Sequence, residues 1–138
     1  MASDNQQCFL DSNIWIYALA EHQDPEKQEV ARRLVSDKSI AISTQVINEV
    51  CRNLIKKSDF PENQIQRLVQ TLYNRCQVTS LNVTILLRAS DLRSRYQLSF
   101  WDSLIVSSAL TSKVSMLYSE DMQHGLIVAE QLTVINPF

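Results

Sequence analysis

The stretch that decides the fold is residues 8–19, CFLDSNIWIYAL. Its first three residues are apolar and predict a short buried strand. Asp11, Ser12 and Asn13 then supply side chains of the kind that begin helices, and residues 14–19 follow in a helical context. A strand that passes directly into a helix is typical of α/β domains. Ligands bind at the carboxyl ends of strands in such sheets, so Asp11 is the first candidate site residue.

The rest of the chain continues this alternation of strands and helices. Strands are predicted at residues 39–42, 76–81, 114–118 and 132–135, and helices at residues 25–35, 44–57, 61–75, 82–95 and 99–110. Strands that alternate with helices favour a parallel sheet covered on both faces. No repeat, linker or low-complexity stretch divides the 138 residues, so one α/β domain is expected.

The composition excludes several classes of protein. Gly125 is the only glycine in the sequence, whereas the phosphate-binding loops of nucleotide-dependent enzymes need several. Three cysteines (Cys8, Cys51 and Cys76) without a Cys-x-x-Cys pair fit buried free thiols rather than zinc sites or disulfides. The N-terminus lacks a signal-peptide pattern and no apolar stretch would span a bilayer, so a cytoplasmic protein without membrane contact is expected. The net charge of −2 gives no general attraction to nucleic acid.

Four of the fifteen acidic residues lie next to predicted strands or near the starts of the helices that follow them. Asp11 and Asp121 each follow a strand, and Glu49 and Asp102 lie near the starts of helices. In a parallel sheet these four places fall at the same edge. Each residue also has an ordinary alternative role: a helix N-cap for Asp11, a solvated helix position for Glu49, a capping box with Ser99 for Asp102, and an acidic turn for Asp121.

Carboxylates gathered at one edge repel one another unless protons or cations neutralise them. Oxygen ligands without histidine or thiolate favour Mg²⁺ or Mn²⁺. Such an ion keeps several waters and binds phosphate, so phosphodiester hydrolysis is the chemistry that this set favours. The predicted catalytic and metal-binding residues are therefore Asp11, Glu49, Asp102 and Asp121.

The motifs, taken in order, resemble those of the PIN-domain family over about residues 9–135. They are residues 9–13 (FLDSN), the helix that carries Glu49, residues 100–105 (FWDSLI) and residues 118–122 (YSEDM). The last resembles the Ser-Glu-Asp-Met-Gln-His-Gly variant of small bacterial PIN proteins. The resemblance implies a single PIN-like domain with about five parallel strands in the order 3-2-1-4-5, and a divalent-metal-dependent endoribonuclease.

The resemblance also implies auxiliary residues and partners. Ser12 and Asn13 would be auxiliary polar contacts, and Glu120 would be an acid behind the metal ligands. Many small members of the family are VapC-like toxins that dimerise and are held inactive by an antitoxin. An RNA substrate, a second copy of the chain and an antitoxin are therefore the expected partners.

Several further residues are candidates for contact with RNA. Five basic residues on two predicted helices could steer a strand, with solvated helix charges as the alternative: Arg52, Lys56, Lys57, Arg93 and Arg95. Trp15 and Trp101 could stack bases, but their apolar neighbours favour the core or a subunit interface.

Two other classes of protein fit parts of the pattern. A receiver domain of signalling proteins is also a small α/β fold with Mg²⁺-binding acids. It would have paired acids after the first strand and a lysine after the last, whereas Leu10 and Ser12 flank Asp11 and nothing basic follows Thr133. A noncatalytic binding module would keep the fold and the acids but act through a partner.

Overall fold

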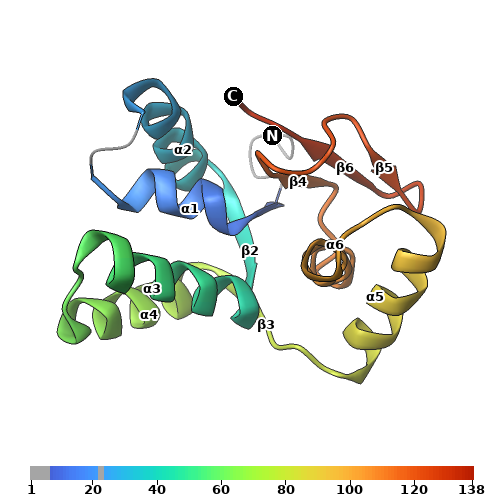
Figure 1. The fold of residues 1–138 in the computed structure, drawn as a ribbon, viewed down its shortest axis with the longest axis horizontal. Helices are drawn as coiled ribbons and strands as arrows, with labels where there is room; N and C mark the ends of the chain where they lie inside the picture. The colour runs from blue at the N-terminus through green and yellow to red at the C-terminus, as the bar shows by residue number, and fades with distance from the viewer. Residues whose placement is uncertain (1–6, 22–23) are drawn as a thin grey trace.

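The computed structural model describes residues 7–21 and 24–138 and shows a mostly parallel sheet flanked by helices (Figure 1). The strands lie in the order β3-β2-β1-β4-β6-β5. Their bounds are Gln7–Leu10 for β1, Ser39–Ser43 for β2, Gln77–Thr79 for β3, Met116–Tyr118 for β4, Ile127–Val128 for β5 and Leu132–Ile135 for β6. All neighbours pair in parallel except β5 and β6, which are antiparallel. The five predicted strands are β1 to β4 and β6, and their predicted order is confirmed.

The short strand β5 was not predicted. It is joined to β6 by a turn in which Ala129 and Glu130 both have positive φ angles, 53° and 56°. Turns of this type normally carry glycine, asparagine or aspartate, whose small or polar side chains tolerate that conformation. An Ala-Glu pair gives no such signal, so the hairpin could not be recognised from the sequence.

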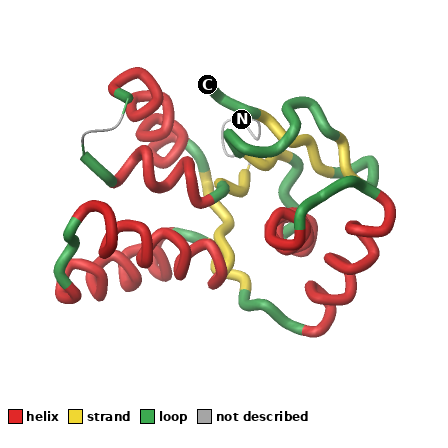
Figure 2. Tube along the Cα trace, viewed as in Figure 1, coloured by secondary structure: helices red, strands yellow, loops and turns green. Residues whose placement is uncertain are grey.

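The helices lie on both sides of the sheet, as predicted. They are α1 Ser12–Leu19, α2 Pro25–Asp37, α3 Thr44–Ser58, α4 Glu62–Arg75, α5 Val83–Arg95 and α6 Phe100–Thr111. Figure 2 shows α1 to α4 on one side of the strands and α5 and α6 on the other. Side-chain caps start several of them, among them Ser43 before α3, Asn82 before α5 and Ser99 before α6.

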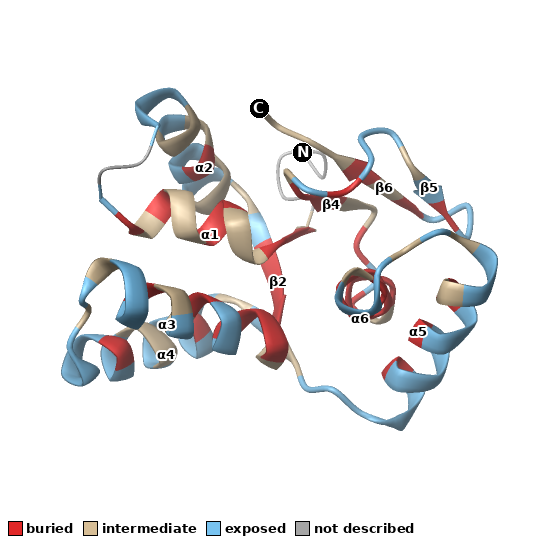
Figure 3. Cartoon of the chain, viewed as in Figure 1, coloured by how far each residue is buried: buried red, intermediate tan, exposed pale blue. Residues whose placement is uncertain are grey.

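Apolar residues face almost every direction around helix α6, and this pattern predicts that the helix is buried on most sides. Every residue of it from Ser103 to Leu110 is buried (Figure 3). It packs against α5 and against the sheet, which explains why apolar side chains surround it almost completely. Asp102 therefore begins a helix that has little access to solvent beyond its first turn.

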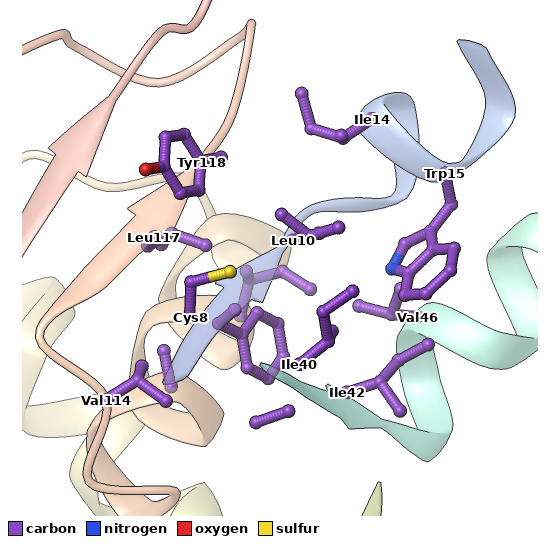
Figure 4. Close-up of a cluster of buried hydrophobic side chains, with 14 of the residues drawn as sticks. Cys8, Leu10, Ile14, Trp15, Ile40, Ile42, Val46, Val114, Leu117 and Tyr118 are labelled. Atoms are coloured by element: carbon purple, nitrogen blue, oxygen red, sulfur yellow. The ribbon is translucent and has the colours of Figure 1, made fainter. Parts of the chain in front are cut away.

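The core between the sheet and α1 and α3 contains Leu10, Ile14, Trp15, Ile42 and Val46 (Figure 4). Trp15 is only 3% exposed, which confirms its prediction as a core residue. The strand that carries Asp11 is consequently anchored by apolar packing on both sides, so the carboxylate at its end has little freedom to move.

The cysteines and the apolar character of the helices were both considered in the sequence. All three cysteines are free thiols, with Cys8 fully buried and Cys51 and Cys76 half-buried. Among residues 7–21 and 24–138, no helix combines the length and apolar character that crossing a bilayer requires.

Candidate active site

Asp11 lies where β1 passes into α1, and β4 brings Ser119 beside it. The two strands are parallel with Leu10 opposite Tyr118, so the next residue of each strand lies at the same edge. Asp11 Oδ2 accepts a 2.8 Å hydrogen bond from Ser119 Oγ, and Oδ1 accepts a 2.7 Å bond from the Ser12 N–H. With 5% of the residue exposed, the carboxylate is a fixed, nearly solvent-free group at the carboxyl edge of the sheet.

The charge of Asp11 is poorly stabilised despite these bonds. The pKa of Asp11 is raised to about 6: burial raises it most, the hydrogen bonds from Ser119 and Ser12 lower it, and the negative charges of Asp102 and Glu49 raise it. A carboxylate whose only role is to cap a helix would gain stability from its ionised form. Here burial and the charges of Asp102 and Glu49 disfavour the ionised form.

Glu49 reaches the start of α1 from α3. Its Oε2 accepts a 3.1 Å hydrogen bond from Ser12 Oγ, and its Oε1 accepts a 2.9 Å bond from Gln45 Nε2. Ser12 Oγ also lies 3.5 Å from Asp11 Oδ1, so the serine bridges the two acids. The predicted auxiliary residue Ser12 thus contacts both carboxylates, and Gln45 is a contact that was not predicted.

Asp121 is held by the other predicted auxiliary residue. Asn13 Nδ2 donates a 3.1 Å hydrogen bond to Asp121 Oδ2, and Asn13 Oδ1 accepts a 3.3 Å bond from the Glu120 N–H. Ser119 Oγ accepts bonds from the N–H groups of Asp121 and Met122, each 3.3 Å long. The loop after β4 is therefore fastened to α1 at the same place where Asp11 is fastened to Ser119.

Asp102 approaches the other acids from α6. Its N–H donates a 3.1 Å hydrogen bond to Ser99 Oγ, which is the half of the expected capping box that the structure forms. Burial raises the pKa of Asp102, Ser99 lowers it, and the negative charges of Asp121 and Glu49 raise it. The four predicted acids therefore influence one another electrostatically, although they come from four separate segments.

The four carboxylates are not arranged around one common point. In the described part of the chain, no three Asp, Glu, His or Cys side chains converge closely enough to hold one metal ion. Glu49 and Asp121 are instead turned to hydroxyl and amide partners. The residues nevertheless fit a hard divalent cation by their chemistry, because the donors are all oxygen and the charges of neighbouring acids raise the pKa values of Asp11 and Asp102.

Glu120 has a different set of partners. Its carboxylate forms an ion pair with Lys27 of α2 and accepts a 2.8 Å hydrogen bond from Tyr17 Oη of α1. Lys27 Nζ also lies 5.4 Å from the Tyr17 ring centre and 5.5 Å from that of Phe138. Burial opposes ionisation of Glu120, but the bonds from Lys27 and Tyr17 outweigh it and lower its pKa. Glu120 thus ties the loop after β4 to α1 and α2.

Tyr17→Phe is expected to destabilise the protein by about 1 kcal/mol, because it removes a hydrogen bond to a charged acceptor. In thermal unfolding at pH 7 this corresponds to a melting temperature about 3 °C lower. The folded-state pKa of Glu120 is depressed, so the difference should be present above its ordinary pKa and disappear as the pH falls through the depressed value. Tyr73→Phe, at an exposed tyrosine of α4, is the matched control and should melt like the wild type.

The predicted basic residues fall into two groups. Arg93 donates a 2.7 Å bond to Ser103 Oγ and lies over the Phe100 ring, and Arg95 pairs with Asp91 at 3.2 Å. These two arginines therefore have partners within the protein. Three cations on α3 are exposed: Arg52, Lys56 and Lys57.

Trp101 does not lie in the core, although its apolar neighbours favoured the core or a subunit interface. It is 63% exposed, because it occupies the first turn of α6, before the helix enters the core.

Two residues of the site, Ser119 and Gln45, were not singled out by the sequence. Gln45 lies one helical turn before Glu49, and that spacing was the available signal. Ser119 belongs to the YSEDM motif, but no pattern indicated that it would bond to Asp11.

The comparisons with known proteins show the family and the fold of the chain. The sequence matches the family model of the PIN domain over residues 8–125. A search of curated proteins found no match.

Several solved structures share the fold. A chain of a toxin-antitoxin complex from Klebsiella pneumoniae aligns with a TM-score of 0.69 at 21% identity, over 95% of this chain and 98% of that one. VapC20 from Mycobacterium tuberculosis, a toxin that cleaves the sarcin-ricin loop, aligns with a TM-score of 0.64 at 18% identity, over 80% and 86%. A chain of the DNA-bound VapBC2 complex from Rickettsia felis gives 0.61 at 20% identity, over 94% and 97%. At these identities the likeness shows the fold alone, whereas the family model covers most of the sequence: the chain belongs to the PIN-domain family.

Proposed function

We propose that the chain is a divalent-metal-dependent endoribonuclease in which Asp11, Glu49, Asp102 and Asp121 hold one or two Mg²⁺ or Mn²⁺ ions. The observation that carries the proposal is the state of Asp11. This carboxylate is buried and fixed by Ser119 and Ser12, and its pKa is raised by burial and by neighbouring acids. Such an arrangement costs stability and is useful when a cation binds there.

The side chains around the acids prepare them for this role. Ser119 and the Ser12 N–H hold Asp11 in one orientation, Gln45 and the Ser12 hydroxyl position Glu49, and Asn13 positions Asp121. Bound Mg²⁺ or Mn²⁺ would supply a water of lowered pKa and neutralise charge on a phosphodiester. The four acids would hold the ion so that this water faces the phosphate. Asp102 would reach the ion from the side of α6.

A histidine base is not needed for this mechanism. His124 Nδ1 accepts a 3.0 Å hydrogen bond from the Asn136 N–H and thereby helps to hold the C-terminal segment. His22 lies outside the described residues. Metal-activated water accounts for the chemistry with the oxygen ligands alone.

The partners follow from the same family. VapC20 is described as a toxin that cleaves the sarcin-ricin loop, and other similar structures are toxin-antitoxin complexes. We infer that the present chain also cleaves RNA, is the toxin of such a pair and is held inactive by an antitoxin. The exposed apolar residues Val83, Leu86 and Leu87 on α5 favour a homodimer, since apolar patches on a surface mark interfaces. Incubating the purified chain with a panel of end-labelled RNAs and Mn²⁺ tests the enzymatic part of the proposal, and RNA binding without cleavage would favour a noncatalytic module.

The cleavage rate at subsaturating metal is expected to fall as the pH drops through about 6, the pKa to which burial raises Asp11. Protons compete with the cation for this carboxylate, so metal binding requires its ionised form. The stability of the metal-free protein should change in the opposite sense. Because the folded pKa lies above the ordinary value, the favourable contribution is present below that value and is lost as the pH rises through about 6.

Both halves of this prediction can be measured on one protein. A pH series of cleavage at fixed low Mn²⁺ gives the first, and melting temperatures in EDTA from acid to neutral pH give the second. The Asp11→Asn variant should lack the stability change around pH 6. A wild-type cleavage rate that is flat down to pH 5 would contradict the assignment of Asp11 as a metal ligand.

A further inference from the structure

A groove of about 530 Å³ lies next to the acidic site, and we call it the α3–α6 groove. Its lining residues come from α3, from the connection between β3 and α5, and from the first turn of α6: Thr44, Gln45, Asn48, Glu49, Leu81 and Trp101. The volume is within the range of about 300–1,000 Å³ that is typical of small-ligand sites. Glu49 belongs both to this groove and to the group of four acids. A ligand in the groove would therefore lie beside the proposed catalytic centre.

Trp101 presents an aromatic surface in this groove. It directly precedes Asp102 in the sequence and is 63% exposed. Its ring is packed edge to face against Phe100, with ring centres 5.2 Å apart. The Phe100 ring in turn lies 4.6 Å beneath the guanidinium carbon of Arg93, which is itself bonded to Ser103. The indole is therefore exposed to solvent and is in contact with the Phe100 ring, which is itself 55% exposed but lies against Arg93. An aromatic surface that is restrained in this way loses less entropy when a ligand stacks on it.

The other lining groups select against phosphate and favour a neutral, planar ligand. Among the described residues that line the groove there is no lysine or arginine, and the one charged residue is the acid Glu49. Asn48 is exposed on α3, one residue before Glu49, and its amide offers both a hydrogen-bond donor and an acceptor. Thr44 adds a hydroxyl and Leu81 an apolar contact. This combination matches a nucleobase, which has a flat face for stacking and an edge of donors and acceptors.

We propose that the α3–α6 groove binds one unpaired nucleobase of the RNA, with the base stacked on Trp101 and its edge bonded to Asn48. The phosphate next to this base then lies at the four acids, of which Glu49 is the one that also lines the groove. This inference rests on the proposed function and specifies its substrate: the nucleotide beside the cleaved bond must be unstacked and unpaired. A double-stranded site cannot supply such a base without first opening.

The first test compares cleavage by three variants. Trp101→Ala is expected to lower kcat/KM for a single-stranded RNA about tenfold, because one base–aromatic stack is lost. Trp101→Phe keeps an aromatic face and should recover most of that loss. Tyr73→Ala removes an aromatic residue that is 52% exposed on α4, away from the groove, and should cleave like the wild type. Equal rates for Trp101→Ala and the wild type would overturn the proposal.

The second test assigns the loss to one base. A set of RNAs is prepared in which each nucleotide around the cleaved bond is replaced in turn by an abasic residue. The wild type should lose about tenfold at one position, whereas Trp101→Ala should be insensitive to the base at that position. Losses from the abasic residue and from Trp101→Ala that simply multiply at every position would show that Trp101 contacts no base.

The third test does not depend on cleavage. Stacking of a base should quench the fluorescence of exposed Trp101, while buried Trp15 supplies a constant background. Titration with a short uncleaved oligonucleotide should therefore quench the wild type and leave Trp101→Phe nearly unchanged. If the wild type cleaves no RNA but shows this quenching, the proposed function fails and the base site stands. Absence of quenching in the wild type would overturn the base site.

Two further measurements, the molar mass in solution and the binding of an antitoxin, test whether a protein occupies the groove instead of a base. If Trp101→Ala converts a dimer into a monomer without changing quenching or cleavage, the groove is an interface between copies of the chain, and the proposal is wrong. If Trp101→Ala instead weakens binding of an antitoxin while RNA cleavage is unchanged, the groove serves a protein partner, which also overturns it.

Discussion

Asp11→Asn is expected to lower the rate of RNA cleavage by at least about a thousandfold, equivalent to about 4 kcal/mol of activation free energy. The substitution is nearly isosteric but removes the negative charge of the most buried of the four acids. A metal ligand contributes its charge directly to the ion that stabilises the transition state, so its loss should be large. Single-turnover cleavage of an end-labelled RNA in saturating Mn²⁺ measures the effect.

The stability of the same variant distinguishes a metal ligand from a helix cap. In EDTA at pH 7.5 the wild type carries an ionised, buried Asp11 whose raised pKa represents a cost of up to about 3 kcal/mol. Asp11→Asn removes that cost and should melt at or above the temperature of the wild type. If Asp11 serves only as the N-cap of α1, the loss of its charge near the helix N-terminus should lower the melting temperature instead.

Asp24 offers a matched control. It caps α2 by accepting hydrogen bonds of 3.0 Å from the Glu26 N–H and 3.3 Å from the Lys27 N–H. Asparagine keeps the cap hydrogen bond but loses the charge near the helix N-terminus, so Asp24→Asn should melt slightly below the wild type and cleave RNA at the wild-type rate. Equal activity of Asp11→Asn and Asp24→Asn would mean that both residues are ordinary caps.

Removal of divalent cations is expected to abolish cleavage, and addition of Mn²⁺ or Mg²⁺ should restore it. The residues gathered around Asp11 include neither a free histidine base nor a thiolate nucleophile in the described part of the chain, and in the proposed mechanism the bound cation would activate the attacking water. Dialysis against EDTA followed by titration with each metal gives the dependence. Strong cleavage in excess EDTA, with a purified Asp11→Asn sample as the control for contaminating ribonucleases, would contradict the mechanism.

Metal binding should also stabilise the folded protein. A ligand at a hundredfold excess over its dissociation constant contributes about 2.7 kcal/mol. For a chain of 138 residues this corresponds to a melting temperature about 9 °C higher. Differential scanning fluorimetry with and without Mn²⁺ measures the shift, and Asp11→Asn should show much less of it. The absence of a shift in the wild type would mean that the four acids do not form a cation site.

The sheet illustrates how far local sequence patterns reach. Apolar runs, helix caps and the alternation of strands and helices predicted β1 to β4 and β6, because burial requires apolar residues at fixed spacing. The order of these strands was implied by the resemblance to the PIN-domain family and is confirmed. The hairpin that adds β5 depends on two residues with positive φ, which ordinary side chains adopt only when surrounding contacts compensate the strain.

The acidic site likewise has features that the sequence predicted and contacts that only the structure shows. Asp11 and Asp121 follow strands, and Glu49 and Asp102 lie near the starts of helices, so the sequence and the rules of parallel sheets predicted that the four acids would share one edge. Their partners could not be predicted in the same way. The bond from Ser119 to Asp11 joins residues 108 positions apart, and the contacts of Glu120 with Tyr17 and Lys27 span 103 and 93 positions.

The sequence by itself determined the class of fold and the burial of α6 and predicted four candidate acids, because these depend on the order and spacing of residue types along the chain. Only the tertiary structure decided which of these side chains touch. It directed Glu120 to Lys27 and Tyr17, and it left Trp101 exposed beside Glu49. The physical reason is that hydrogen bonds and solvent exposure depend on the packing of segments far apart in the sequence, and helical periodicity does not indicate where a helix leaves the core.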